Sequence, residues 1–233
     1  MKPFLELQPT EHQSFRIIGH GARGNLAARL EASFEQAATD FERACAMRAD
    51  AFVDIISTFP DDEQTIVELD RNHPNTFAAM RTICYTAIDN FLAGDFDNAA
   101  AQFELLLDCD SEDPLESIQL LALCYIGLGE WDSFESVEID LGDKSPILPL
   151  GRAIISFEEQ GAVDKSAVQA LARFREFASE FKATEHPTDE SYLQDIGSEN
   201  PSRAALAREL YLQTEIATKN YQQALAAIRQ ALG

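Results

Sequence analysis

Gly94-Asp95-Phe96-Asp97 recurs 35 residues later as Gly129-Glu130-Trp131-Asp132. Each copy runs glycine, acid, aromatic, acid, and each follows an apolar run, over 83–92 in the first copy and 120–128 in the second. A period of about 34 residues with such a turn is typical of stacked helix–turn–helix pairs. Because one such pair cannot bury its apolar face alone, it packs on its neighbours, and the stack usually presents a surface to a partner rather than a catalytic pocket.

Apolar residues at helical spacing extend this pattern over most of the chain. We expect helices over 25–48, 51–59, 61–73, 76–93, 96–109, 114–128, 131–139, 149–160, 164–183, 201–218 and 220–232. Asn25, Asp113 and Asn200 are the predicted N-caps, and Pro60 should end the second helix. Residues 184–200 are expected to form the longest loop. No stretch alternates with a period of two, so we expect no sheet of consequence.

Small and aromatic residues flank the two turns in a regular order: Ala87, Ala99 and Phe103 in the first unit, and Ala122 and Tyr125 in the second. In a last unit, Asn220-Tyr221 fits part of the turn, and Ala224, Ile228 and Ala231 follow it. With these residues, the segments 80–140 and 203–232 resemble the tetratricopeptide repeat (TPR) family. Asn90, Phe134 and Lys219 depart from the family pattern, which has an aromatic, an alanine and a glycine at these places.

The resemblance implies an all-α fold, an α-α superhelix built as a solenoid of helical hairpins in a single compact array. The array would span residues 76–233, and residues 1–75 would contribute an N-terminal segment and helices that pack on it. The family's pattern also implies that small residues let paired helices approach closely, while the aromatic fills the gap beside them.

The same resemblance implies a partner-binding groove, because the first helix of each pair lines the concave face in this family. The residues expected there are Arg81, Cys84, Ile88 and Phe91 from the first unit and Glu116, Gln119, Leu123 and Ile126 from the second. This lining is mixed and partly apolar. Arg81 is its one base, so we do not expect the clamp with which some family members hold a C-terminal carboxylate.

Composition limits the class of function. The net charge of −22 comes from 40 acids and 18 bases, which argues against binding nucleic acid through phosphates and against binding anionic membranes. The charge serves solubility or attracts a partner with basic segments. The four cysteines and four histidines have no metal-ligand spacing, and we expect neither a metal nor a cofactor. No apolar run is long enough to span a membrane and no signal peptide is visible, so a cytoplasmic location is expected.

We therefore expect a non-enzymatic module that binds a protein or peptide, as an adaptor, assembly factor or chaperone. One alternative is a nucleotide-binding regulator or enzyme, because Gly19-His20-Gly21-Ala22-Arg23-Gly24 spells G-x-G-x-x-G between a weak strand and a helix. That motif belongs to a fold with repeated strand–helix–strand units, and the chain supplies helices instead. A second alternative is a structural homo-oligomer, in which the exposed ends of helical arrays stack on each other.

Overall fold

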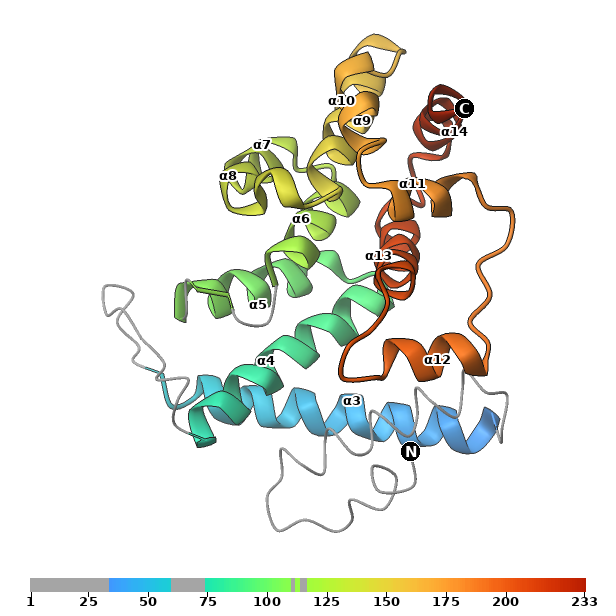
Figure 1. Cartoon of the computed structure of the whole chain (residues 1–233). Helices are drawn as coiled ribbons and strands as arrows, with labels where there is room; N and C mark the ends of the chain where they lie inside the picture. The colour runs from blue at the N-terminus through green and yellow to red at the C-terminus, as the bar shows by residue number, and fades with distance from the viewer. Residues whose placement is uncertain (1–33, 60–73, 110–111, 114–116) are drawn as a thin grey trace. The chain divides into compact units, whose positions relative to one another are not determined.

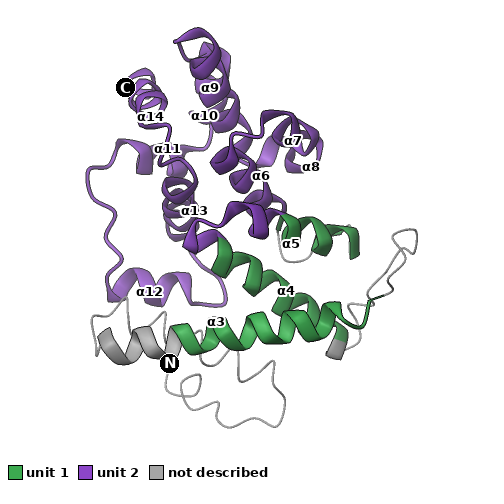
Figure 2. Ribbon diagram, turned by 180° about the vertical axis from the view of Figure 1, so that it is seen from behind, with its two compact units in different colours: residues 1–90, 101–117 green, residues 91–100, 118–233 purple. Residues whose placement is uncertain are grey.

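The computed structural model describes residues 34–59, 74–109, 112–113 and 117–233 (Figure 1). Every regular element in these ranges is a helix and none is a strand, which confirms the all-α class. The chain divides into two compact units, with residues 1–90 and 101–117 in unit 1 and residues 91–100 and 118–233 in unit 2 (Figure 2). The predicted helix over 61–73 and the N-cap Asn25 lie outside the described residues. The boundary between residues 75 and 76, which would separate the N-terminal segment from the helical array, stays a prediction.

In unit 1, α3 (Phe34–Ile56) is one helix where the sequence predicted two, over 25–48 and 51–59. The predicted break was wrong because residues 47–53 hold neither glycine nor proline to interrupt the backbone hydrogen bonds. A buried ion pair joins α3 to α4 (Pro74–Ala93). Arg48 donates from Nε and Nη2 to the two carboxylate oxygens of Asp89, each at 2.5 Å, and the side chains are 5% and 13% exposed.

In both copies of the glycine turn, which lie in unit 2, the glycine adopts the left-handed conformation. Gly94 ends α4 with φ +81°, and Gly129 ends α6 (Ser117–Leu128) with φ +73°. The Gly94 N–H donates to the carbonyl of Phe91 at 3.0 Å, and the Gly129 N–H donates to the carbonyl of Ile126 at 3.1 Å. Glycine fits here because the left-handed region excludes most side chains. The aromatic residue then begins the next helix, α5 (Phe96–Cys109) or α7 (Trp131–Ser136).

Two further glycines let an aromatic ring pack directly against a helix backbone. A Cβ added at Gly127 of α6 would lie 2.6 Å from Cδ2 of Phe96, and one added at Gly151 of α9 (Ile147–Gln160) would lie 2.2 Å from Cζ of Phe134. Phe134 is fully buried, at a position where the resemblance to the TPR family would place alanine. The glycine on α9 therefore makes the room that this larger residue needs.

The rest of unit 2 is a packed set of short helices. They are α8 (Glu138–Leu141), the 3₁₀ turn η1 (Gly142–Lys144), α10 (Lys165–Leu171), α11 (Arg175–Lys182), α12 (Glu190–Ile196), α13 (Arg203–Ala217) and α14 (Gln222–Leu232). Helix α9 packs against α10 and α14, α11 packs against α13 and α14, and α12 packs against α13. The core of this set is formed by fully buried side chains that include Ile147, Leu150, Ile154, Leu171, Ala224 and Ile228.

Several predicted bounds in this region were wrong. The helix predicted over 131–139 ends at Ser136 and is followed by α8, and the one predicted over 164–183 is interrupted at 172–174. Residues 184–200 contain α12, and the N-cap of α13 is Ser202 rather than Asn200. Among the helices that the structure describes, none has the length and apolar character needed to cross a membrane.

Candidate functional site

An aromatic cluster within unit 2 supports the candidate site. Helix α11 turns Phe177 and Phe181 toward Tyr211 of α13, and all three side chains are buried. Their ring centroids lie 5.1 to 6.3 Å apart with edge-to-face angles. This arrangement is favourable for aromatic pairs, so the cluster fixes α11 on α13.

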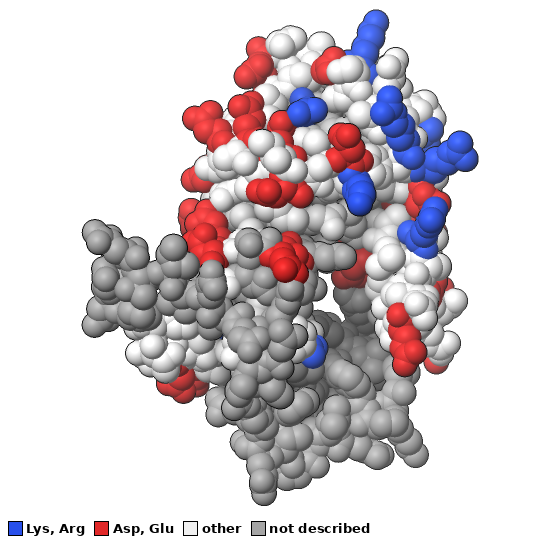
Figure 3. All heavy atoms as spheres, turned by 60° about the vertical axis from the view of Figure 1, so that its left-hand side comes forward, with Lys and Arg blue, Asp and Glu red and all other residues white. Residues whose placement is uncertain are grey.

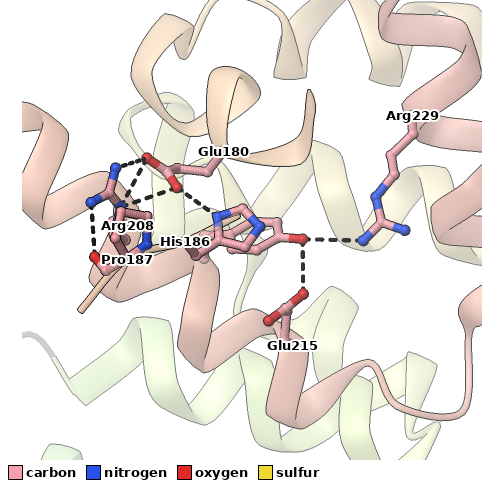
Figure 4. Close-up of polar contacts among 7 residues, drawn as sticks. Glu180, His186, Pro187, Arg208, Glu215 and Arg229 are labelled. Carbon is pink, nitrogen blue, oxygen red and sulfur yellow. Dashed lines mark hydrogen bonds and ion pairs between the residues drawn. The ribbon is translucent and has the colours of Figure 1, made fainter. Parts of the chain in front are cut away.

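A buried carboxylate lies beside this cluster and is fully compensated. Glu180 of α11 is 7% exposed, and its two oxygens accept hydrogen bonds from the Arg208 guanidinium at 3.2 to 3.3 Å (Figure 4). His186 Nδ1 lies 2.8 Å from Oε2 of the same carboxylate. Arg208 also donates from Nη1 to the carbonyl of Pro187 at 3.0 Å. Moving His186 or Arg208 away would leave the buried Glu180 carboxylate without one of its partners, which is costly. These contacts therefore hold the segment 183–189 in place.

Tyr211 connects this charge cluster to α14. The His186 ring lies over the Tyr211 ring, with centroids 4.4 Å apart and planes tilted by 32°. The Tyr211 hydroxyl donates to Oε1 of Glu215 at 2.9 Å and accepts from Nη2 of Arg229 at 3.1 Å (Figure 4). Burial raises the pKa of Tyr211, and the Arg229 guanidinium opposes this while the Glu215 carboxylate adds to it. The phenol therefore stays protonated at neutral pH and can donate a hydrogen bond.

A cavity of about 550 Å³ opens beside these groups, and we call it the Tyr211 pocket. It is lined by Phe181, Lys182, Ala183, Thr184, His186, Tyr211, Glu215, Arg229 and Gly233. Lys182 and Thr184 are exposed on its rim, so the pocket is accessible to solvent. The lining combines cations, a carboxylate, hydroxyls and an aromatic wall, which suits a ligand that combines polar groups with apolar surface.

The predicted groove residues are divided between the units. Arg81, Cys84 and Ile88 lie on α4 in unit 1, whereas Gln119 lies on α6 in unit 2 together with Leu123 and Ile126, and Phe91 is also in unit 2. Glu116 lies outside the described residues. The groove as a whole therefore stays a prediction.

Burial separates these residues into two groups. Cys84, Phe91, Leu123 and Ile126 are buried, and burial raises the pKa of the Cys84 thiol to about 11. A role for them in partner binding would need the helices to open. Arg81, Ile88 and Gln119 are half-buried. Arg81 donates to the Tyr85 hydroxyl at 3.0 Å, and Gln119 accepts from the Ser145 hydroxyl at 3.3 Å.

Sequence reasoning missed the Tyr211 pocket. The contacts between helices in and beside it join residues 18 to 28 positions apart, which helical periodicity cannot predict. One local signal was present, because Arg208, Tyr211 and Glu215 recur at intervals of three and four and therefore share one face of a helix. The glycine-rich loop Gly19–Gly24 lies outside the described residues. In the part of the chain that the structure describes, no group of three or more His, Cys, Asp or Glu could hold a metal ion.

These features define a protein whose described part is all-helical and has an open polar pocket in unit 2. Comparison with protein-family models, with curated proteins and with solved structures found no match for the chain.

Proposed function

We propose that this chain is a TPR-like, non-enzymatic module that binds a protein or peptide segment. The observation that carries the proposal is the repeated turn, in which Gly94 and Gly129 have the same left-handed geometry and each is followed by an aromatic residue that begins the next helix. Repeated hairpins of this kind build extended binding surfaces in solenoid proteins. A superhelical array over 76–233 and a cytoplasmic location belong to the same proposal.

The partner's chemistry is proposed from charge. A net charge of −22 attracts segments that carry Lys or Arg, and this attraction acts mainly on the rate of association. The aromatic wall of the Tyr211 pocket offers apolar area to such a segment, and the lining holds the Glu215 carboxylate beside Lys182 and Arg229. The half-buried residues Arg81, Ile88 and Gln119 remain candidates for further contacts.

The experiment is a selection of random peptides displayed on phage against the immobilised full-length chain. We expect enriched peptides that carry bases beside an aromatic or aliphatic residue, with affinities of about 1–100 μM when measured as synthetic peptides. Thr184→Trp should fill the rim of the Tyr211 pocket and weaken this binding. Ser179→Trp is the matched control, because Ser179 is exposed on α11 and does not line the pocket.

Three outcomes would contradict the proposal. Selection could enrich no peptide above an unrelated acidic protein. A nucleotide could instead raise the melting temperature of the chain, since a ligand that binds only the folded state stabilises it by mass action. Light scattering over a dilution series could instead find stable assemblies of the chain alone, which would favour a structural homo-oligomer.

A further inference from the structure

Charge is unevenly distributed along the chain. Residues 144–182 hold six of the 18 bases but only five of the 40 acids, so this segment is nearly balanced while the remainder carries 35 acids and 12 bases. Figure 3 shows Lys and Arg side chains gathered along one side of the upper half of the face drawn, and Asp and Glu along the other side. The segment 144–182 therefore carries nearly as many acids as bases, unlike the rest of the chain.

A cleft of about 450 Å³ in unit 2 is lined by residues of this segment and by Asp143 just before it, and it lies between α9, α10 and the residues before α9. Its floor is apolar, with Leu148 and Pro149 from α9, Ala167 from α10 and Phe174 from the turn after α10. Leu148 and Ala167 are buried, and Phe174 is half-buried. The floor thus offers apolar area on which a single side chain of a ligand can be covered.

Two arginines stand at this cleft, which we call the Arg152–Arg173 cleft. Arg152 donates from Nε and Nη2 to Glu138 at 2.8 and 2.6 Å, and these two bonds fix the plane of a guanidinium that is 55% exposed. Its Nη1 is not used in this pair. Arg173 is exposed and forms no ion pair with any residue in the described part of the chain. Asp143 is the one acid among the lining residues.

We propose that the Arg152–Arg173 cleft binds a peptide segment in which an apolar side chain stands next to an acidic one. The apolar side chain would cover the floor, and the carboxylate would accept hydrogen bonds from Arg173 and from Nη1 of Arg152. Guanidinium donors suit a carboxylate because the planar fork matches its two oxygens. The charge of −22 does not prevent this, since charges farther than about 8 Å are largely screened at physiological ionic strength.

This inference rests on the proposed function and adds a second, acidic type of ligand to it. The probes are capped synthetic peptides of the form Gly-Ser-Glu-Phe-Glu-Gly-Ser, together with versions that replace both Glu by Gln, both Glu by Lys, or Phe by Gly. Each is titrated into the ¹⁵N-labelled full-length chain and followed by NMR at the amides of Ala167 and Ala170 and at the side-chain Nε–H of both arginines. We expect the Glu-Phe-Glu peptide to shift these signals with a dissociation constant of about 0.1–1 mM. The other three peptides should bind at least about fivefold more weakly.

Arg173→Gln should weaken binding of the Glu-Phe-Glu peptide about fivefold. Arg175→Gln is the matched control, because Arg175 is exposed two residues away and does not line the cleft. It makes the same change of net charge and should alter affinity less than about twofold. Melting curves of both variants should match that of the parent chain, since neither side chain is part of the core.

The proposal is overturned if the Lys-containing peptide binds as tightly as the Glu-containing one, if the shifted signals lie away from the cleft, or if both arginine variants weaken binding equally. If peptides selected on phage bind elsewhere while the Glu-Phe-Glu peptide does not bind, the cleft assignment fails and the proposed function stands. If neither kind of peptide binds, both fail.

Discussion

Replacing a helix glycine by alanine can raise or lower the stability of a protein, depending on what lies beside the glycine. In the middle of a helix, glycine is less stable than alanine by about 0.5–1 kcal/mol, so a substitution there ordinarily stabilises a protein. At Gly151 the Cβ would lie 2.2 to 2.8 Å from three atoms of the Phe134 ring, and that ring is fully buried. The clash should therefore outweigh the gain in helix propensity.

We expect Gly151→Ala to lower the free energy of unfolding by about 1–3 kcal/mol, as overpacked cores do. Urea denaturation followed by circular dichroism measures the effect. Phe134→Leu supplies the test of mechanism, because removing the ring makes room for the new methyl group. The double variant should be less destabilised than the sum of the two single variants, and strict additivity would contradict the assigned contact.

The Cys84 thiol gives a second prediction at this scale. Burial raises its pKa from 9.0 to about 11, which lowers the thiolate fraction at neutral pH about a hundredfold. We expect Cys84 to be alkylated by iodoacetamide at least about a hundredfold more slowly in the folded chain than in urea, with a rate that rises about tenfold per pH unit between pH 7 and 9. Mass spectrometry of peptides resolves Cys84 from the other cysteines.

The raised pKa of Cys84 also determines how the stability of the folded state changes with pH. The unfolded thiol ionises at its ordinary pKa of 9.0 and the folded thiol only near 11, so the folded state holds the proton longer. The contribution to stability is complete below about pH 9 and is lost as the pH rises toward about 11. Equal alkylation rates in the folded and unfolded chain would show that the burial of Cys84 is not maintained in solution.

At the scale of single helices, the sequence predicted best where a turn glycine marks an end. Helices α4 and α5 were predicted over 76–93 and 96–109, and they run over Pro74–Ala93 and Phe96–Cys109. The interruption at 172–174 could not be predicted in this way, because Ala172, Arg173 and Phe174 include neither glycine nor proline. There the last turn tightens, with the Arg173 N–H donating to Ala170 and the Phe174 N–H to Leu171, and the packing of α11 on α13 sets the new direction. The Tyr211 pocket could not be predicted from helix patterns either, because it depends on contacts between helices.

The corrected N-cap of α13 can be tested directly. The Ser202 hydroxyl accepts from the Ala205 N–H at 3.1 Å and donates to Oδ2 of Asp195 at 2.6 Å. We expect Ser202→Ala to cost about 0.5–2 kcal/mol of stability, as the loss of an N-cap does. Asn200→Ala is the control and should change stability by less than about 0.5 kcal/mol, because Asn200 is exposed and does not cap the helix.

A second measurement on the same variant does not depend on stability. The hydrogen bonds from Ser202, the hydroxyl first and the backbone N–H second, lower the pKa of Asp195. Ser202→Ala should therefore raise the pKa of Asp195 toward its ordinary value, which an NMR titration of the carboxylate reports. A larger loss of stability in Asn200→Ala than in Ser202→Ala would show that Asn200 is the N-cap, as the sequence predicted.

On the scale of the whole molecule, charge opposes compactness. The net charge of −22 makes the folded chain repel itself, and the 35 acids outside residues 144–182 carry most of that repulsion. Added salt screens the repulsion and should stabilise the folded state. We expect the melting temperature to rise as NaCl is raised from about 20 to about 300 mM. The rise should be about 2–4 °C for each kcal/mol gained in the free energy of unfolding.

Potassium chloride is the control, because screening depends on ionic strength rather than on which monovalent cation is present. The two salts should give the same rise in a thermal-shift measurement. A melting temperature that stays constant or falls would mean that ion pairs such as Arg152–Glu138 contribute more to stability than the general repulsion removes.

The chain holds a single tryptophan, Trp131, at the start of α7, with its ring centroid 5.5 Å from that of Tyr221. Both residues belong to unit 2. Tyrosine emission overlaps tryptophan absorption, so light absorbed by Tyr221 is passed to the indole while the two rings are in contact. The tryptophan emission of the native protein therefore reports locally on the contact between the α6–α7 turn and the start of α14, and an event confined to unit 1 should leave this emission unchanged.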